Sequence, residues 1–264
     1  MARSCSGWTT ANYFSRSDTG ITAEPLTMGV WIKVASVTAG AARCWGGLGN
    51  NGAAGEYIGF LTAAGAFSSQ KANDAGTTMG AASGATLIDA NTWTFVAAIF
   101  VDDSTPRTYA KNVIFEKTFG TSVSDPTIDF QAIGARVRAA ITIPFDGNVA
   151  LLTMWNAELF LAEFDALSGG DHPVRIRPKN IMRAWWNPTS GSRLTDFSGN
   201  AANLTLTGTV TDDAFGPPVE PFPYHYSMPI GVQAPLVEEA AVGRPFRLAG
   251  IGGGLVGEPG RLAA

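Results

Sequence analysis

Cysteine, histidine and charged residues are scarce in this chain, and each shortage excludes a class of protein. The 264 residues include only 2 cysteines and 2 histidines. Cys5 and Cys44 are too few for a disulfide framework, so we expect two buried thiols instead. His172 and His225 lie far apart in the sequence and offer no zinc-ligand spacing. The sequence therefore predicts no metal site and no cofactor.

The low charge also limits the partners. Charged residues make up 15% of the chain and the formal net charge is -4, so no global basic field exists to attract nucleic acid. No run approaches the roughly 18 apolar residues that a membrane-spanning helix needs, and the N-terminal residues lack the apolar core of a secretory signal. We therefore expect no nucleic-acid or membrane partner, and a protein that is made and folded in a cytoplasm.

Hydrophobic residues and turn formers are abundant. The chain is 45% hydrophobic and contains 31 glycines and 15 prolines. This balance favours strands joined by tight turns over a helical bundle, and the length allows one large core. The composition predicts a β-sandwich.

Short apolar runs mark the expected strands. Residues 26–34 alternate between two faces, and residues 92–101 form a β-branched and aromatic run that predicts a central strand. Weaker strands are expected around 56–61 and 77–79, with a turn at 50–52 and a glycine-rich loop at 44–47. Further strands are predicted at these positions: 12–16, 107–110, 113–117, 128–135, 185–186 and 204–207.

Residues 145–167 carry the most informative pattern. A turn at 145–147 precedes a strand at 148–156 with apolar side chains on both faces. An amphipathic stretch follows at 158–167 and predicts one helix, with Glu158 at its solvated start and Glu163 on its outer face. A β-sandwich in which a single helix follows the strands is a recognisable architecture.

Several segments together resemble one family. The strand LTMGVWIK at 26–33 is similar to "FTMSAWVK", TWTFVAA at 92–98 to "WHHVA", and YAKNV at 109–113 to a "YVNGV" hairpin. IGA at 133–135 and FDG…MWN at 145–156 resemble the "IGA" strand and "FDGxIDEVRIWN". In this order they resemble the concanavalin A-like jelly roll of the laminin-G and pentraxin branch, over roughly residues 10–212. The resemblance implies an all-β jelly-roll sandwich with one short helix, in a family that hosts lectins, hydrolases and structural modules.

Departures from the family restrict the expected sites. Calcium-binding members carry a Gln and several acidic residues after the "IGA" strand, but this chain has Arg136 and Arg138 there. Two cations repel Ca²⁺, so no calcium site is expected. Glucanases of this fold place three carboxylates on one strand, whereas Glu158 and Glu163 flank Phe160 at the middle position. We favour the helix interpretation, and a glycoside hydrolase stays a remote alternative.

Exposed aromatic side chains would let a lectin-like domain stack on sugar rings. Most tryptophans are expected in the core or at its rim. Trp45, in the glycine-rich loop, is the candidate for an exposed glycan-binding residue.

The character of the chain changes after residue 216. Eight of the prolines and many glycines lie in residues 217–264, which cannot build a core of their own. We therefore expect a sandwich at 1–216 and an extended C-terminal arm at 217–264 that contacts a neighbouring protein surface. The apolar anchors predicted on the arm are Val232, Leu236, Val242, Phe246, Leu248, Ile251 and Leu255.

These features predict a structural protein without catalytic activity. We expect a bacteriophage virion protein, a capsid decoration protein in a homo-oligomer, anchored to other virion proteins by its arm. The resemblance implies this location, because laminin-G-like domains recur in phage particles. The alternative is a carbohydrate-binding module that attaches to host-surface polysaccharide.

Overall fold

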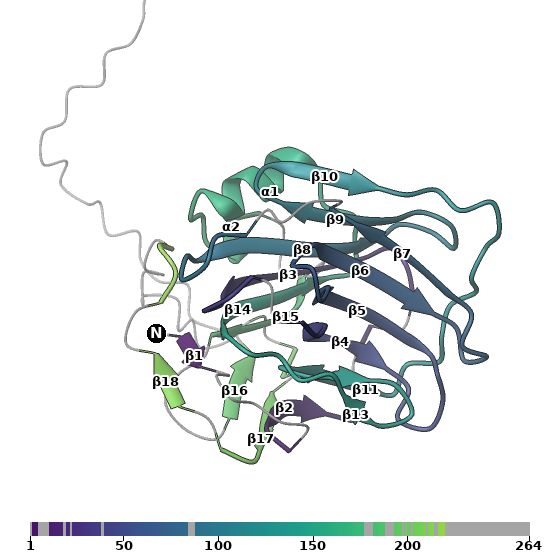
Figure 1. Cartoon of the computed structure of the whole chain (residues 1–264), viewed down its shortest axis with the longest axis horizontal. Helices are drawn as coiled ribbons and strands as arrows, with labels where there is room; N and C mark the ends of the chain where they lie inside the picture. The colour runs from purple at the N-terminus through teal and green to yellow at the C-terminus, as the bar shows by residue number, and fades with distance from the viewer. Residues whose placement is uncertain are drawn as a thin grey trace, which may run out of the picture. The chain divides into compact units, whose positions relative to one another are not determined.

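The computed structural model describes residues 2–4, 11–17, 20–21, 23–37, 40–83, 88–176, 182–187, 193–196, 198, 200–201, 203–209, 211–213 and 216–219. In this part of the chain, antiparallel strands form two sheets that face each other (Figure 1). The predicted arm anchors, from Val232 to Leu255, lie outside the described residues. The division at residue 216 stays a prediction.

The first sheet is built around the strongest sequence patterns. Its strand order is β10-β9-β8-β3-β14-β15, with β1 paired to β14 and β18 paired to β1. The strands are β1 (Ala2–Ser4), β3 (Leu26–Lys33), β8 (Thr94–Phe100), β9 (Pro106–Ala110), β10 (Val113–Glu116), β14 (Asn148–Trp155), β15 (Met182–Asn187) and β18 (Thr211–Asp213). The predicted strands at 26–34, 92–101 and 148–156 are confirmed at its centre.

The second sheet faces the first and has the order β17-β2-β11-β4-β5-β6-β7. Its strands are β2 (Tyr13–Arg16), β4 (Arg43–Gly49), β5 (Glu56–Leu61), β6 (Phe67–Ala72), β7 (Thr78–Ala82), β11 (Phe130–Ile133) and β17 (Leu204–Thr207). Strand β16 (Arg193–Asp196) pairs with both β15 and β17 and joins the sheets. A small pair, β12 (Arg136–Val137) and β13 (Ile141–Thr142), stands apart from them.

Two apolar layers hold the first sheet. One layer lies between the sheets and contains Phe14, Met28, Val30, Trp45 and Phe100. The other lies on the opposite face of the first sheet and contains Trp31, Phe95, Tyr109, Trp155 and Phe164. Strands covered on both faces explain why β8 and β14 read as continuous apolar runs instead of alternating.

Helix α1 (Leu161–Ser168) covers the second layer, followed by α2 (Pro173–Ile176). Phe164 and Leu167 point into the layer, and Figure 1 shows α1 close to β9 and β10. The hydroxyl of Thr27 on β3 accepts from Leu159 N at 3.2 Å and donates to Ala157 O at 2.7 Å. These bonds fix the chain that enters the predicted helix. In the described residues, no helix has the length and apolar character that crossing a membrane requires.

The predicted turns follow the expected chemistry. In the β9–β10 hairpin, Lys111 and Asn112 have φ of 47° and 63°, as a two-residue type I′ loop requires. In the turn at 50–52, Gly52 N donates to the Asn50 side chain at 2.8 Å. Side-chain acceptors of this kind stabilise turns that have no ladder partner.

Candidate functional site

Trp45 is not exposed, so the prediction of a glycan-stacking tryptophan in a loop is wrong. Cys44-Trp45-Gly46-Gly47 lies in strand β4, and the Trp45 side chain is 0% exposed. Its ring stacks on Phe67 with centroids 6.2 Å apart. The glycine-rich sequence suggested a loop, but Gly46 and Gly47 lie where the backbones of the neighbouring strands β11 and β5 come too close for a Cβ. Cys44 is also buried, and burial raises the pKa of its thiol to about 12.

Glu163 belongs to the predicted helix, whereas Glu158, predicted at its start, lies outside it because the helix begins at Leu161. Glu163 is the third residue of α1, and its carboxylate accepts a hydrogen bond from Phe160 N at 2.8 Å. Glu158 precedes the helix and pairs with Arg107 on β9. The segment is a helix and not the strand that the glucanase pattern requires. The hydrolase alternative therefore gains no support from these two carboxylates.

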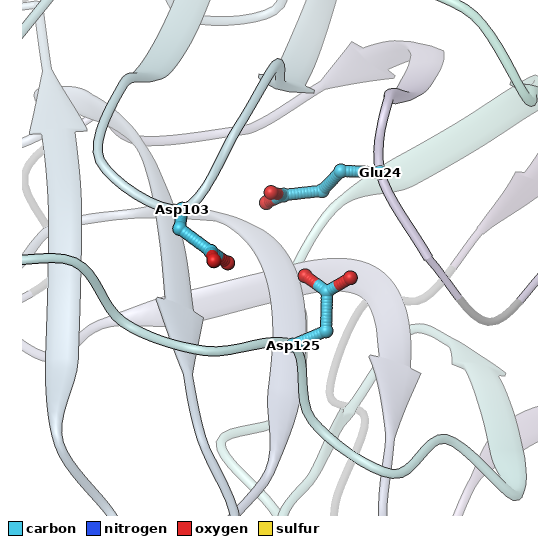
Figure 2. A group of neighbouring side chains, drawn as sticks. All are labelled: Glu24, Asp103 and Asp125. Carbon is cyan, nitrogen blue, oxygen red and sulfur yellow. The ribbon is translucent and has the colours of Figure 1, made fainter.

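A buried lysine surrounded by carboxylates lies at one end of the sandwich. Tyr57 on β5 and Lys71 on β6 are directly opposite each other and point between the sheets. Glu24 precedes β3, Asp103 follows β8, and Asp125 lies in the loop before β11. We call these five residues the Lys71 cluster. Figure 2 shows the three carboxylates turned toward one another from three separate loops.

The ammonium group of Lys71 lies at the centre of the cluster. Its Nζ donates to Asp103 Oδ1 at 2.7 Å and to Asp125 Oδ1 at 2.8 Å, and it lies 3.1 Å from Glu24 Oε1. Tyr57 donates its hydroxyl proton to Asp125 Oδ1 at 2.6 Å. The side chain of Lys71 is 0% exposed and that of Glu24 6%, against 51% for Asp103 and 38% for Asp125. The cluster is closed on the inside and open to solvent at its rim.

Backbone contacts hold the loops of the Lys71 cluster in place. Asp102 accepts from Ser104 N at 2.8 Å, which fixes the turn that presents Asp103. Val123 N donates to Asp103 O at 2.7 Å and joins this turn to the loop of Asp125. Asp103 and the loop of Asp125 are therefore positioned by the fold and not only by the lysine.

Burial and charge have opposite effects on these groups. Burial raises the pKa of Glu24 to about 7, although Lys71 opposes the shift. Burial also disfavours the Lys71 ammonium, but hydrogen bonds to Asp103 and Asp125 outweigh it and raise the pKa of Lys71. For Asp125, hydrogen bonds from Lys71 and Tyr57 outweigh burial and lower the pKa of the carboxyl. Glu24 thus has a pKa near neutral pH and can exchange a proton there.

The arrangement does not fit a divalent cation. The carboxylate oxygens of Glu24, Asp103 and Asp125 lie within 4.8 Å of one another, a spacing that metal ligands share. However, the Lys71 ammonium already occupies the space between them. A second cation there would be repelled and would have to displace a fully buried side chain.

The pKa of Glu24 predicts a pH dependence of stability. Between about 4.5 and about 7, the folded protein binds more protons at this carboxyl than the unfolded chain does. Its contribution to the free energy of unfolding is therefore complete below the lower value and is lost as the pH rises through the upper one. We expect Glu24→Gln to flatten this part of the curve, measured by urea unfolding at a series of pH values. An unchanged slope in the variant would show that Glu24 is not the titrating group.

A second charged group lies on the opposite face of the same strands. Glu56 is next to Tyr57, so its side chain points away from the space between the sheets. It is fully buried and accepts from Arg136 Nε at 2.6 Å and from Gln70 Nε2 at 2.8 Å, while Arg138 Nη1 lies 3.6 Å away. Both arginines that follow the IGA strand thus face one glutamate.

Exposed polar groups surround this ion pair at the loop tips. Asn51 N donates to Asp129 Oδ1 at 2.9 Å, and Thr127 N donates to Asp74 Oδ2 at 3.1 Å. Arg138 Nη2 donates to Gly76 O at 3.4 Å. We call Asn51, Asp74, Asp129 and Arg138 the outer loop cluster. The loop before β11 carries both Asp125 and Asp129, so it contributes to both groups.

No protein-family model and no curated protein matches the chain. Solved structures do resemble it. A putative carbohydrate binding protein from Bacteroides ovatus has a TM-score of 0.55 and 16% identity, covering 80% of this chain and 59% of that one. The fold is the concanavalin A-like jelly roll. The predicted all-β class and the jelly-roll resemblance are confirmed.

Two other jelly-roll domains match at lower scores. A sialidase CBM40 module from Ruminococcus gnavus, bound to alpha2,3 sialyllactose, has a TM-score of 0.46 at 16% identity and covers 56% of this chain and 84% of that one. A SAP-like pentraxin from Limulus polyphemus has a TM-score of 0.47 at 12% identity, covering 63% and 80%. At these identities the likeness concerns the fold alone.

Proposed function

We propose that this chain is a non-catalytic carbohydrate-binding module whose glycan site is the outer loop cluster. The observation that carries the proposal is the fixed orientation of its polar groups. Asp74 and Asp129 are exposed carboxylates, and each accepts a hydrogen bond from the backbone of a neighbouring loop. Arg138 lies half-buried beside them as a cationic donor.

Such groups match the chemistry of a sugar. The hydroxyls of a glycan donate to carboxylate oxygens and accept from a guanidinium group. Groups that are already held in place lose little conformational entropy on binding, so more of the interaction energy remains as affinity. The Glu56–Arg136 ion pair beneath them supplies a rigid base.

The comparisons support the same class of function. The Bacteroides ovatus protein with this fold is described as a putative carbohydrate binding protein. Our expectation of a phage capsid decoration protein in a homo-oligomer depended on the arm and stays a prediction, as does location in a virion. A carbohydrate-binding module on a particle surface would satisfy both.

The proposal is tested by glycan binding. We expect the chain to bind at least one polysaccharide on a glycan array. The Asp129→Ala substitution should weaken that binding about tenfold or more, because a hydrogen bond to a charged group contributes about 1.5–3 kcal/mol. The matched control is Asp89→Ala, which removes an exposed carboxylate that pairs with Lys111 outside the outer loop cluster. If no glycan is retained, or if both variants bind as the parent does, the proposal is wrong.

A further inference from the structure

The Lys71 cluster contains the groups needed for a reaction within the chain. The other described lysines are half-buried or exposed, whereas the Lys71 side chain is fully buried. Its Nζ lies 2.8 Å from Asp125 Oδ1. A nucleophilic nitrogen and a carboxyl carbon are thus held at close approach by strand β6 and the loop before β11.

Tyr57 polarises the carboxyl group of Asp125. Its hydroxyl donates to Asp125 Oδ1, the same oxygen that contacts Lys71. A donor at this oxygen stabilises the negative charge that develops there when a nucleophile adds to Cγ. Asp103 is more exposed than Asp125 and does not share this tyrosine contact, so Asp125 is the better electrophile.

Glu24 is suited to carry protons in the same step. Its side chain is 6% exposed and its Oε1 lies 3.1 Å from Lys71 Nζ. Burial places the pKa of its carboxyl at about 7. A general acid–base works best when its pKa is close to the ambient pH, because it can then both accept and return a proton.

We propose that Lys71 and Asp125 form an intramolecular amide bond, with Glu24 as the general acid–base. One proton passes from the ammonium to Oδ2 of the Asp125 carboxylate, which gives a neutral amine and a carboxylic acid and leaves Oδ1, the oxygen that Tyr57 contacts, as the carbonyl oxygen. The amine electron pair attacks Cγ, and Glu24 takes a second proton from the nitrogen. Glu24 returns this proton to the hydroxyl group on Cγ, and the C–O bond breaks to release water.

The step balances without another reactant. Of the three hydrogens on the ammonium, one remains on the amide nitrogen and two leave in water, and no atom is oxidised or reduced. The charged pair is the state from which the reaction starts, since the pKa of Lys71 is raised. One turnover per molecule suffices, and the high effective concentration of two groups fixed in contact favours ring closure. The bond ties β6 covalently to the loop before β11 and is independent of glycan binding.

Intact mass measurement of the full chain tests the proposal directly. After allowance for removal of Met1, we expect a mass lower than the sequence mass by one water molecule. Tryptic digestion should yield a branched peptide that joins Lys71 to Asp125. A folded chain at its full sequence mass overturns the proposal.

Variants assign the roles. Lys71→Arg keeps a cation but cannot form the bond, and it should have its full mass, as should Asp125→Ala. Glu24→Gln should also have its full mass, because the proton carrier is gone. Asp103→Asn is the matched control and should still lose one water. If Glu24→Gln loses water, the role of Glu24 is wrong, and if Asp103→Asn alone prevents the loss, the bonded aspartate is wrong.

Discussion

Replacing Lys71 with Met should lower the free energy of unfolding by about 3–5 kcal/mol, the cost typical of breaking a buried ion pair from one side. The substitution keeps the apolar stem but removes the ammonium group that contacts Glu24, Asp103 and Asp125. The carboxyl groups of Glu24, Asp103 and Asp125 then face one another without a cation between them. The same substitution would also prevent an amide bond to Asp125, so a loss of stability is expected whether or not that bond forms. Urea unfolding followed by tryptophan fluorescence measures the loss.

Two further variants separate this effect from a general loss of positive charge. Lys111→Met removes an exposed ammonium that pairs with Asp89, and we expect a change within about 0.5 kcal/mol. At alkaline pH, where Glu24 is ionised, adding Glu24→Gln to Lys71→Met should recover part of the lost stability, since a buried charge is removed. If Lys71→Met unfolds at the same urea concentration as the parent, the ammonium does not stabilise the cluster.

The central strands and the helix could be predicted because their sequences carry their own burial pattern. In β3, β8 and β14, β-branched and aromatic residues are frequent and turn residues bound each run. The helix was marked by apolar residues at helical spacing after Trp155. These elements lie in the first sheet, which is covered by apolar side chains on both faces.

The second sheet was predicted less well because its strands are held by tertiary contacts. Strand β6 reads FSSQKA and was missed, since serine, glutamine and lysine give no apolar alternation. Strand β4 contains three glycines and was expected to be a loop. Both strands are stabilised by ladder bonds to β5, which no local pattern reveals.

The Lys71 cluster could not be found from sequence spacing. Glu24, Asp103 and Asp125 lie in three loops far apart along the chain, and each reads as an ordinary acidic turn residue. The one local signal is that Lys71 lies on the same inward face of β6 as Phe67, because alternate residues of a strand point to the same side. That signal is visible only after β6 has been recognised as a strand. The outer loop cluster could not be predicted for a related reason, since its members come from separate loops that only the folded chain brings together.

The contact between Trp45 and Gly59 leads to the second large prediction. We expect Gly59→Ala to lower the free energy of unfolding by about 3 kcal/mol, at the upper end of the usual range for overpacked cores. A Cβ at residue 59 would come closer to the Trp45 indole than any real Cβ contact allows. The indole is fully buried and stacks on Phe67, so it cannot move away without displacing the layer between the sheets. The midpoint of urea unfolding measures the effect.

Gly120→Ala is the matched control for this prediction, because no atom lies within 4 Å of the added methyl group and Gly120 is exposed. Its free energy of unfolding should stay within about 0.5 kcal/mol of the parent. A smaller ring at residue 45 should relieve the clash, so Trp45→Phe combined with Gly59→Ala should be less unstable than the two separate losses added together. Strict additivity of the two substitutions would mean that the ring and the methyl group do not compete for the same space, and that Gly59 serves some purpose other than accommodating Trp45.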